Sequence, residues 1–174
     1  MESVMRRLLA LLALASPVAV WAPLTAMASS PDASFYKHAA HGGIAEVEAG
    51  NLAQQKSTNP KVKDFGAMMV KDHTAANNKL KALADSKSVS LPSSSSVGQM
   101  ATKAKLEVFS GETFDKSYVK RQIKAHEDTV DLFQKEIASG KDADAKAFAK
   151  ESLPTIRSHL KAIRAIAASV GVSK

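Results

Sequence analysis

The segment "NPKVKDFGAMMVKDHTAANNKLKALA", residues 59–84, decides the predicted fold. Asn59 and Pro60 form a helix start signal, because asparagine caps helix N-termini and proline favours the first helical position. Apolar residues then recur on one face at helical spacing, namely Val62, Phe65, Met69 and Leu80. His73 falls on the same face. The segment therefore predicts a long amphipathic helix that turns an imidazole inward together with its apolar side chains.

Another helix start signal, Ser30-Pro31-Asp32, lies upstream and predicts a helix over residues 31–56. Only residues 57–59 separate this helix from the next one. A connection that short makes consecutive helices antiparallel neighbours. Residues 31–84 are therefore expected to form a helix hairpin.

A serine-rich link over residues 85–111 follows this hairpin. Serine competes with helical hydrogen bonds, so the link is expected to be irregular apart from a short helix over residues 99–109. The link is long enough to cross from one end of a helical bundle to the other. Such a connection is typical of ferritin-like four-helix bundles, which contain one long crossover.

Residues 112–170 are expected to form a second helix hairpin. Its first helix covers residues 113–139 and stops at Gly140, and its second begins at Asp142 or Asp144. The predicted fold class is therefore all-α, a ferritin-like four-helix bundle with one long crossover between the second and third long helices.

The N-terminal residues 1–28 have the features of a secretory signal peptide. Arg6 and Arg7 precede an apolar run, and Ala26-Met27-Ala28 has the small-x-small pattern of a signal-peptidase site. A single transmembrane anchor is the alternative, although prolines interrupt the apolar run. Cleavage after Ala28 would leave residues 29–174 as a single domain, periplasmic or secreted.

The formal net charge of the chain is +7, and it contains no cysteine. An exported domain without cysteine forms no disulfide and depends on its hydrophobic core. Export argues against a nucleic-acid partner, whereas an anionic envelope surface would suit the positive charge. A solvated basic face without a specific partner is the alternative. The oligomeric state cannot be read from these features.

Histidines carry the main chemical signal. Like His73, His126 and His159 share a helix face with apolar residues, and Glu46 is the inward polar residue of the first helix. A rise of about 1.5 Å per residue puts Glu46, His73 and His126 at about 20 Å from the first turn and His159 near 15 Å. These four side chains are therefore expected to meet near the middle of the bundle.

Three imidazoles and one carboxylate suit a transition metal such as zinc, iron, copper or nickel. Asp72 and other nearby polar residues could accept hydrogen bonds from the imidazoles. A packed histidine network that fixes helix register without metal is the alternative. The function classes left open are a metal-binding protein, a structural or stress-associated envelope protein, and a metal-dependent redox enzyme. Common hydrolase and nucleotide-binding motifs are absent from the sequence, so no enzyme activity or catalytic residue is assigned.

Several motifs resemble those of the bacterial family catalogued as domain of unknown function 4142, over about residues 34–168. They are Glu46-Val47-Glu48, Met69-Val70-Lys71-Asp72-His73, Phe114-Asp115 with Tyr118, His126, and Leu153-Pro154 ahead of His159-Leu160. The resemblance implies a ferritin-like fold and export, but no activity. Some members carry an outer-membrane label, which fits poorly because alternating strands of a barrel are not visible. The Glu-x-x-His motifs of di-iron proteins are also missing, since Val70, Ile123 and Ile156 stand three residues before the histidines.

Overall fold

The computed structural model describes residues 31–172, and within this range the protein is helical and contains no strand. The elements are α1 (Pro31–Lys56), α2 (Pro60–Ser86), α3 (Val97–Glu107), α4 (Gly111–Ser139), α5 (Ala143–Ala167) and a final 3₁₀ turn, η2 (Ala168–Val170). The predicted all-α class is confirmed. The predicted signal peptide lies outside the described residues. Among the helices of residues 31–172, none combines the length and the hydropathy that crossing a membrane requires.

Side-chain caps explain where α2, α3 and α5 begin. The Asn59 side chain accepts a hydrogen bond from the Lys61 backbone N–H at 2.9 Å, as the start signal predicted. Asp142 caps α5 in the same way. The short helix in the link begins two residues earlier than expected, because Ser96 and Gln99 form a reciprocal capping box at its start.

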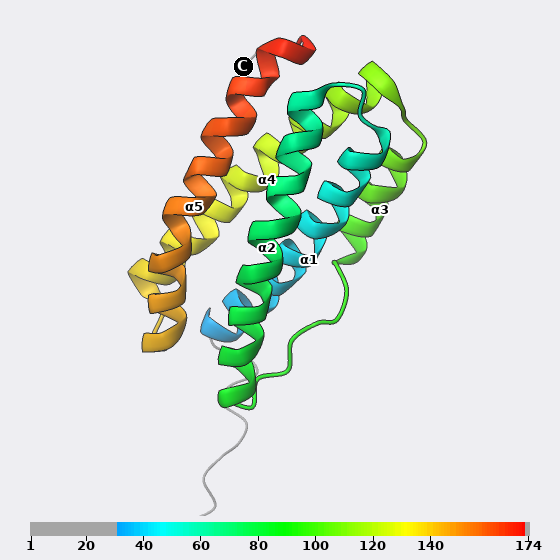
Figure 1. Ribbon diagram of the computed structural model, residues 1–174. Coiled ribbons are helices and arrows are strands. Elements are labelled where there is room, and N and C mark those ends of the chain that lie inside the picture. The colour runs from blue at the N-terminus through cyan, green and yellow to red at the C-terminus, as the bar shows by residue number, and fades with distance from the viewer. Residues whose placement is uncertain (1–30, 173–174) are drawn as a thin grey trace, which may run out of the picture.

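The long helices form two antiparallel pairs, α1 with α2 and α4 with α5, and α2 and α4 run in the same direction (Figure 1). Contacts at both ends of the molecule agree with this arrangement. At one end, Ser57 after α1 donates a hydrogen bond to Asp115 in the first turns of α4. At the other, Asp32 in α1 accepts one from the Lys141 backbone N–H between α4 and α5. The link and α3 connect the end of α2 to the start of α4 and run back along the length of the bundle.

Helices α1 and α2 approach each other closely where Gly50 faces Gly66. A Cβ atom built on Gly66 would lie 2.7 Å from the Gly50 carbonyl oxygen, and one on Gly50 would lie 2.6 Å from the Gly66 carbonyl oxygen. Only glycine fits at such a separation. This contact fixes the register between the two helices.

A polar layer divides the core into two apolar clusters. The Phe65 cluster includes Phe65, Met69, Phe114, Tyr118, Val119 and Ile163. The Phe35 cluster includes Phe35, Tyr36, Leu80, Phe133, Phe148 and Ile156. Between them along the four long helices lie the buried side chains that we call the polar layer: Glu46, His73, Gln122, His126 and His159. The expected meeting of inward histidines near mid-bundle is thus observed.

Candidate metal centre

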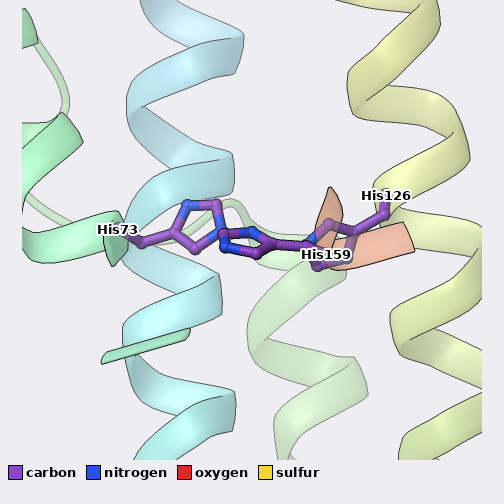
Figure 2. Close-up of side chains that lie close together, drawn as sticks. All are labelled: His73, His126 and His159. Atoms are coloured by element: carbon purple, nitrogen blue, oxygen red, sulfur yellow. The ribbon is translucent and has the colours of Figure 1, made fainter. Parts of the chain in front are cut away.

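Each of the three inward histidines comes from a different helix. His73 lies on α2, His126 on α4 and His159 on α5, and their relative exposures are 9%, 1% and 2%. Their rings point toward one another (Figure 2), with ring centroids 5.5 to 5.9 Å apart. One ring nitrogen of each histidine lies within 4.8 Å of the others. Three imidazoles are therefore brought together at a distance that a single ion can span.

Hydrogen bonds fix which nitrogen of two imidazoles carries the proton. His126 Nδ1 lies 2.9 Å from the Gln122 carbonyl oxygen, which can only accept, so Nδ1 is the protonated nitrogen. His159 Nε2 lies 3.0 Å from Oδ2 of Asp72 on α2 and donates to that carboxylate. In the neutral form of each ring, His126 Nε2 and His159 Nδ1 are therefore the nitrogens that carry the lone pairs. Histidines that bind metals are oriented by such outer hydrogen bonds.

One nitrogen of every histidine in the polar layer has no hydrogen-bond partner among residues 31–172. These atoms are buried and comprise His73 Nε2, His126 Nε2 and His159 Nδ1. Leaving a buried polar atom unpaired costs about 1–3 kcal/mol. Two of them, His126 Nε2 and His159 Nδ1, are the nitrogens opposite the ones that donate to Gln122 and Asp72. A bound ligand could therefore pair with imidazole nitrogens that the rest of the protein leaves unpaired.

Burial keeps two of the imidazoles uncharged. Desolvation, with the neighbouring His126 and His159 rings, lowers the pKa of His73 to about 3. Desolvation also lowers the pKa of His159, although the hydrogen bond to Asp72 opposes this shift. Neutral imidazole is the form that binds metals. At neutral pH a metal ion would therefore displace no proton from His73.

Glu46 on α1 belongs to the polar layer but not to the set of three close ligand atoms. Its side chain is buried, and Oε2 has no hydrogen-bond partner within the part of the chain that the structure describes. Burial raises the pKa of this carboxyl, although the electrostatic influence of His126 and a hydrogen bond with Gln122 act in the opposite direction. The carboxyl group is a neighbour of the histidine set rather than a member of it.

Other groups near the layer were partly foreseen. Asp72 was expected to accept from an imidazole, and its partner is His159 across the helix interface. Gln122 was missed, although the carbonyl four residues before a helical histidine can accept from Nδ1 in some side-chain rotamers, as it does for His126. Tyr118 was also missed as a buried polar group. It packs beside the layer, and its hydroxyl finds no hydrogen-bond partner among the described side chains and backbone.

A cleft of about 310 Å³ adjoins the polar layer and has His73, His159 and Glu46 in its lining.

The three imidazoles favour some metals over others. Imidazole nitrogen suits zinc, copper, iron and nickel, whereas magnesium and calcium prefer oxygen ligands. Three protein ligands with a position left over is the usual composition of catalytic zinc sites, whereas structural zinc sites have four protein ligands.

The fold has solved counterparts. A DUF305 protein from Streptomyces coelicolor, provisionally described as secreted, aligns with a TM-score of 0.70 at 16% identity, covering 84% of this chain and 98% of that one. A DUF305 fragment from Deinococcus radiodurans aligns with a TM-score of 0.69 at 11% identity, covering 81% of this chain and 95% of that one. At these identities the likeness is one of fold alone.

None of the curated proteins matches the sequence. A family model does match it, over residues 21–166, and its description is domain of unknown function. This match includes α1 to α4 and nearly all of α5, with every residue of the polar layer. The chain therefore belongs to the DUF4142 family.

Proposed function

We propose that this protein binds one transition-metal ion through His73, His126 and His159. The observation that carries the proposal is the unpaired nitrogen on each of the three buried imidazoles. In a histidine network without metal, these nitrogens would hydrogen-bond to one another or to their neighbours. Among the described residues they do not, and a bound cation would satisfy all three at once.

The proposal includes the setting of the site. The mature chain would comprise residues 29–174, exported after removal of residues 1–28. Its four long helices would form a ferritin-like four-helix bundle with a single crossover. The parallel course of α2 and α4 supports this topology. The secreted description of the Streptomyces coelicolor protein agrees with export.

Zinc, copper, nickel and iron are the candidate ions, because all of them accept imidazole nitrogen. Asp72 would hold His159 in the orientation that binds, and the Gln122 carbonyl would do the same for His126. Glu46 is the nearby carboxyl that could join the metal on binding. A carboxylate-bridged pair of irons is not part of the proposal, since the chain lacks the Glu-x-x-His motifs.

Metal titration of the mature protein tests the proposal. After treatment with a chelator, the protein should take up one equivalent of zinc, copper, nickel or ferrous iron by calorimetry and native mass spectrometry. His126→Ala should abolish tight uptake. His41→Ala is the matched control, because His41 lies on α1 outside the polar layer and contacts the Ser94 carbonyl oxygen. Uptake of no metal, together with an unchanged melting temperature, would refute metal binding and leave a packed histidine network.

An assay for turnover distinguishes a metal-dependent redox enzyme from a protein that only binds metal. A metal-dependent redox enzyme would consume peroxide or oxygen once loaded. If the loaded protein binds its metal and does neither, the function is binding or buffering of the metal alone.

A further inference from the structure

The cleft beside the polar layer has the size of a small-molecule site. Its volume of about 310 Å³ compares with roughly 300–1,000 Å³ for ligand pockets. All four long helices contribute to its lining, and it reaches His73 and His159 from the side of the Phe35 cluster. A molecule in the cleft would therefore lie against the histidine set.

Most of the inner wall of the cleft is apolar. Leu80, Phe133, Phe148 and Ile156 line it and also belong to the Phe35 cluster. The rim is polar and carries an exposed ion pair between Lys79 and Glu151. The cleft thus offers apolar contact inside and charged groups where it meets solvent, which is the usual construction of small-molecule sites.

The metal end of the cleft favours an anion. Three neutral imidazoles would leave the charge of a divalent cation uncompensated, and a buried uncompensated charge is unfavourable. Glu46 lies outside the set of three close ligand atoms, and if it joined the metal it would supply only one negative charge. Because His73 and His159 both line the cleft, a negatively charged group in it would lie beside the metal and could take the fourth coordination position.

We infer that the cleft binds a small carboxylate with an apolar body. Its carboxylate occupies the free coordination position, and its body lies among the Phe35 cluster side chains. This inference rests on the proposed metal binding, and it adds the class of ligand that the same site accepts.

Cobalt-loaded protein provides the test, because the visible spectrum of Co²⁺ changes with its coordination. Acetate and benzoate are titrated in parallel, since they share a head group and differ in apolar body. We expect benzoate to bind at least about 10-fold more tightly than acetate, because the phenyl ring buries apolar area in the cleft.

Two variants narrow the cleft. Gly42 lines it, and a Cβ atom there meets nothing within 4 Å, so Gly42→Leu extends into open space. Ala76→Leu adds bulk from α2 on another wall. Both should bind Co²⁺ as before and lose the preference for benzoate. Gly98→Leu is the control, because Gly98 lies on α3 with equally open surroundings and outside the cleft.

The outcomes separate the two proposals. Failure of the unmodified protein to bind Co²⁺ would overturn metal binding and, with it, this inference. Uptake of Co²⁺ with no preference for benzoate over acetate would overturn the inference alone. So would a preference that persists in both cleft variants.

Discussion

Replacing His73 with leucine should make the metal-free protein more stable while removing its response to metal. The side chain is buried, its Nε2 is unpaired, and its ring touches only the other two imidazoles among the ring contacts of the described residues. Leucine is close in volume to histidine and has no polar atom. His73→Leu therefore removes one unpaired group without leaving a cavity.

The magnitude follows from the cost of that group. An unpaired buried polar atom costs about 1–3 kcal/mol, and imperfect packing of leucine will offset part of the gain. We expect the variant without metal to be about 1–2 kcal/mol more stable. For a domain of this length, that corresponds to a melting temperature roughly 2–8 °C higher.

Metal reverses the order of stability. Zinc at about 1,000 times its dissociation constant stabilises the native state by about 4 kcal/mol. The unmodified protein should gain this amount, and the variant should gain almost none. The assay is urea unfolding at pH 7.5, with chelator and with zinc. At that pH the imidazole is mostly neutral in the unfolded chain as well, so proton linkage contributes little.

Two results would refute the reasoning. If the metal-free variant is less stable than the unmodified protein by more than about 1 kcal/mol, His73 supports the fold through interactions of its own, as a packed histidine network would. If zinc stabilises the variant as much as the unmodified protein, His73 is not a ligand.

Three further predictions concern other parts of the chain. Burial and the neighbouring Asp32 carboxylate raise the pKa of Glu136 from 4.5 to about 7, so the proton on Glu136 stabilises the fold fully below pH 4.5 and this contribution is lost as pH rises through 7. The stability of Glu136→Gln relative to the unmodified protein should therefore increase by about 1–3 kcal/mol between pH 5 and pH 8. A stability difference in urea unfolding that stays constant with pH would contradict this. Asp72→Asn should weaken zinc binding about 10- to 100-fold by calorimetry, because the carboxylate orients a ligand; the prediction fails if the exposed control Asp64→Asn weakens it equally. Gly66→Ala should destabilise the protein by about 1–3 kcal/mol in thermal unfolding, because the alanine Cβ would meet the backbone of α1. If the variant is as stable as the unmodified protein, α1 and α2 can move apart at that point without cost.

The order and extent of the long helices followed from local signals. Asn59 and Asp142 cap their helices through contacts with the next few residues, so the sequence contains the whole interaction. The meeting of His73, His126 and His159 could also be anticipated, because helix rise and the long link set their heights. For these features the relevant distances are along the helix axis.

Contacts between helices were harder to foresee. Asp72 neighbours His73 in sequence but holds His159, because side-chain direction decides which imidazole it reaches. Glu46 has the predicted height and burial, yet its carboxyl stands outside the set of close ligand atoms. Position along a helix predicts the height of a side chain in the bundle. Whether the side chain reaches the metal site depends on its rotamer and its packing.

The division of the histidines between the two hairpins has a kinetic consequence. His73 belongs to the α1–α2 pair, and His126 and His159 belong to the α4–α5 pair. An ion held by all three would join the two halves of the molecule, and neither half alone could offer more than two of these imidazoles. Parting of the hairpins would then break at least one metal–imidazole bond, so a bound ion should slow the opening of the bundle. The rate of global unfolding should therefore fall when the metal is bound.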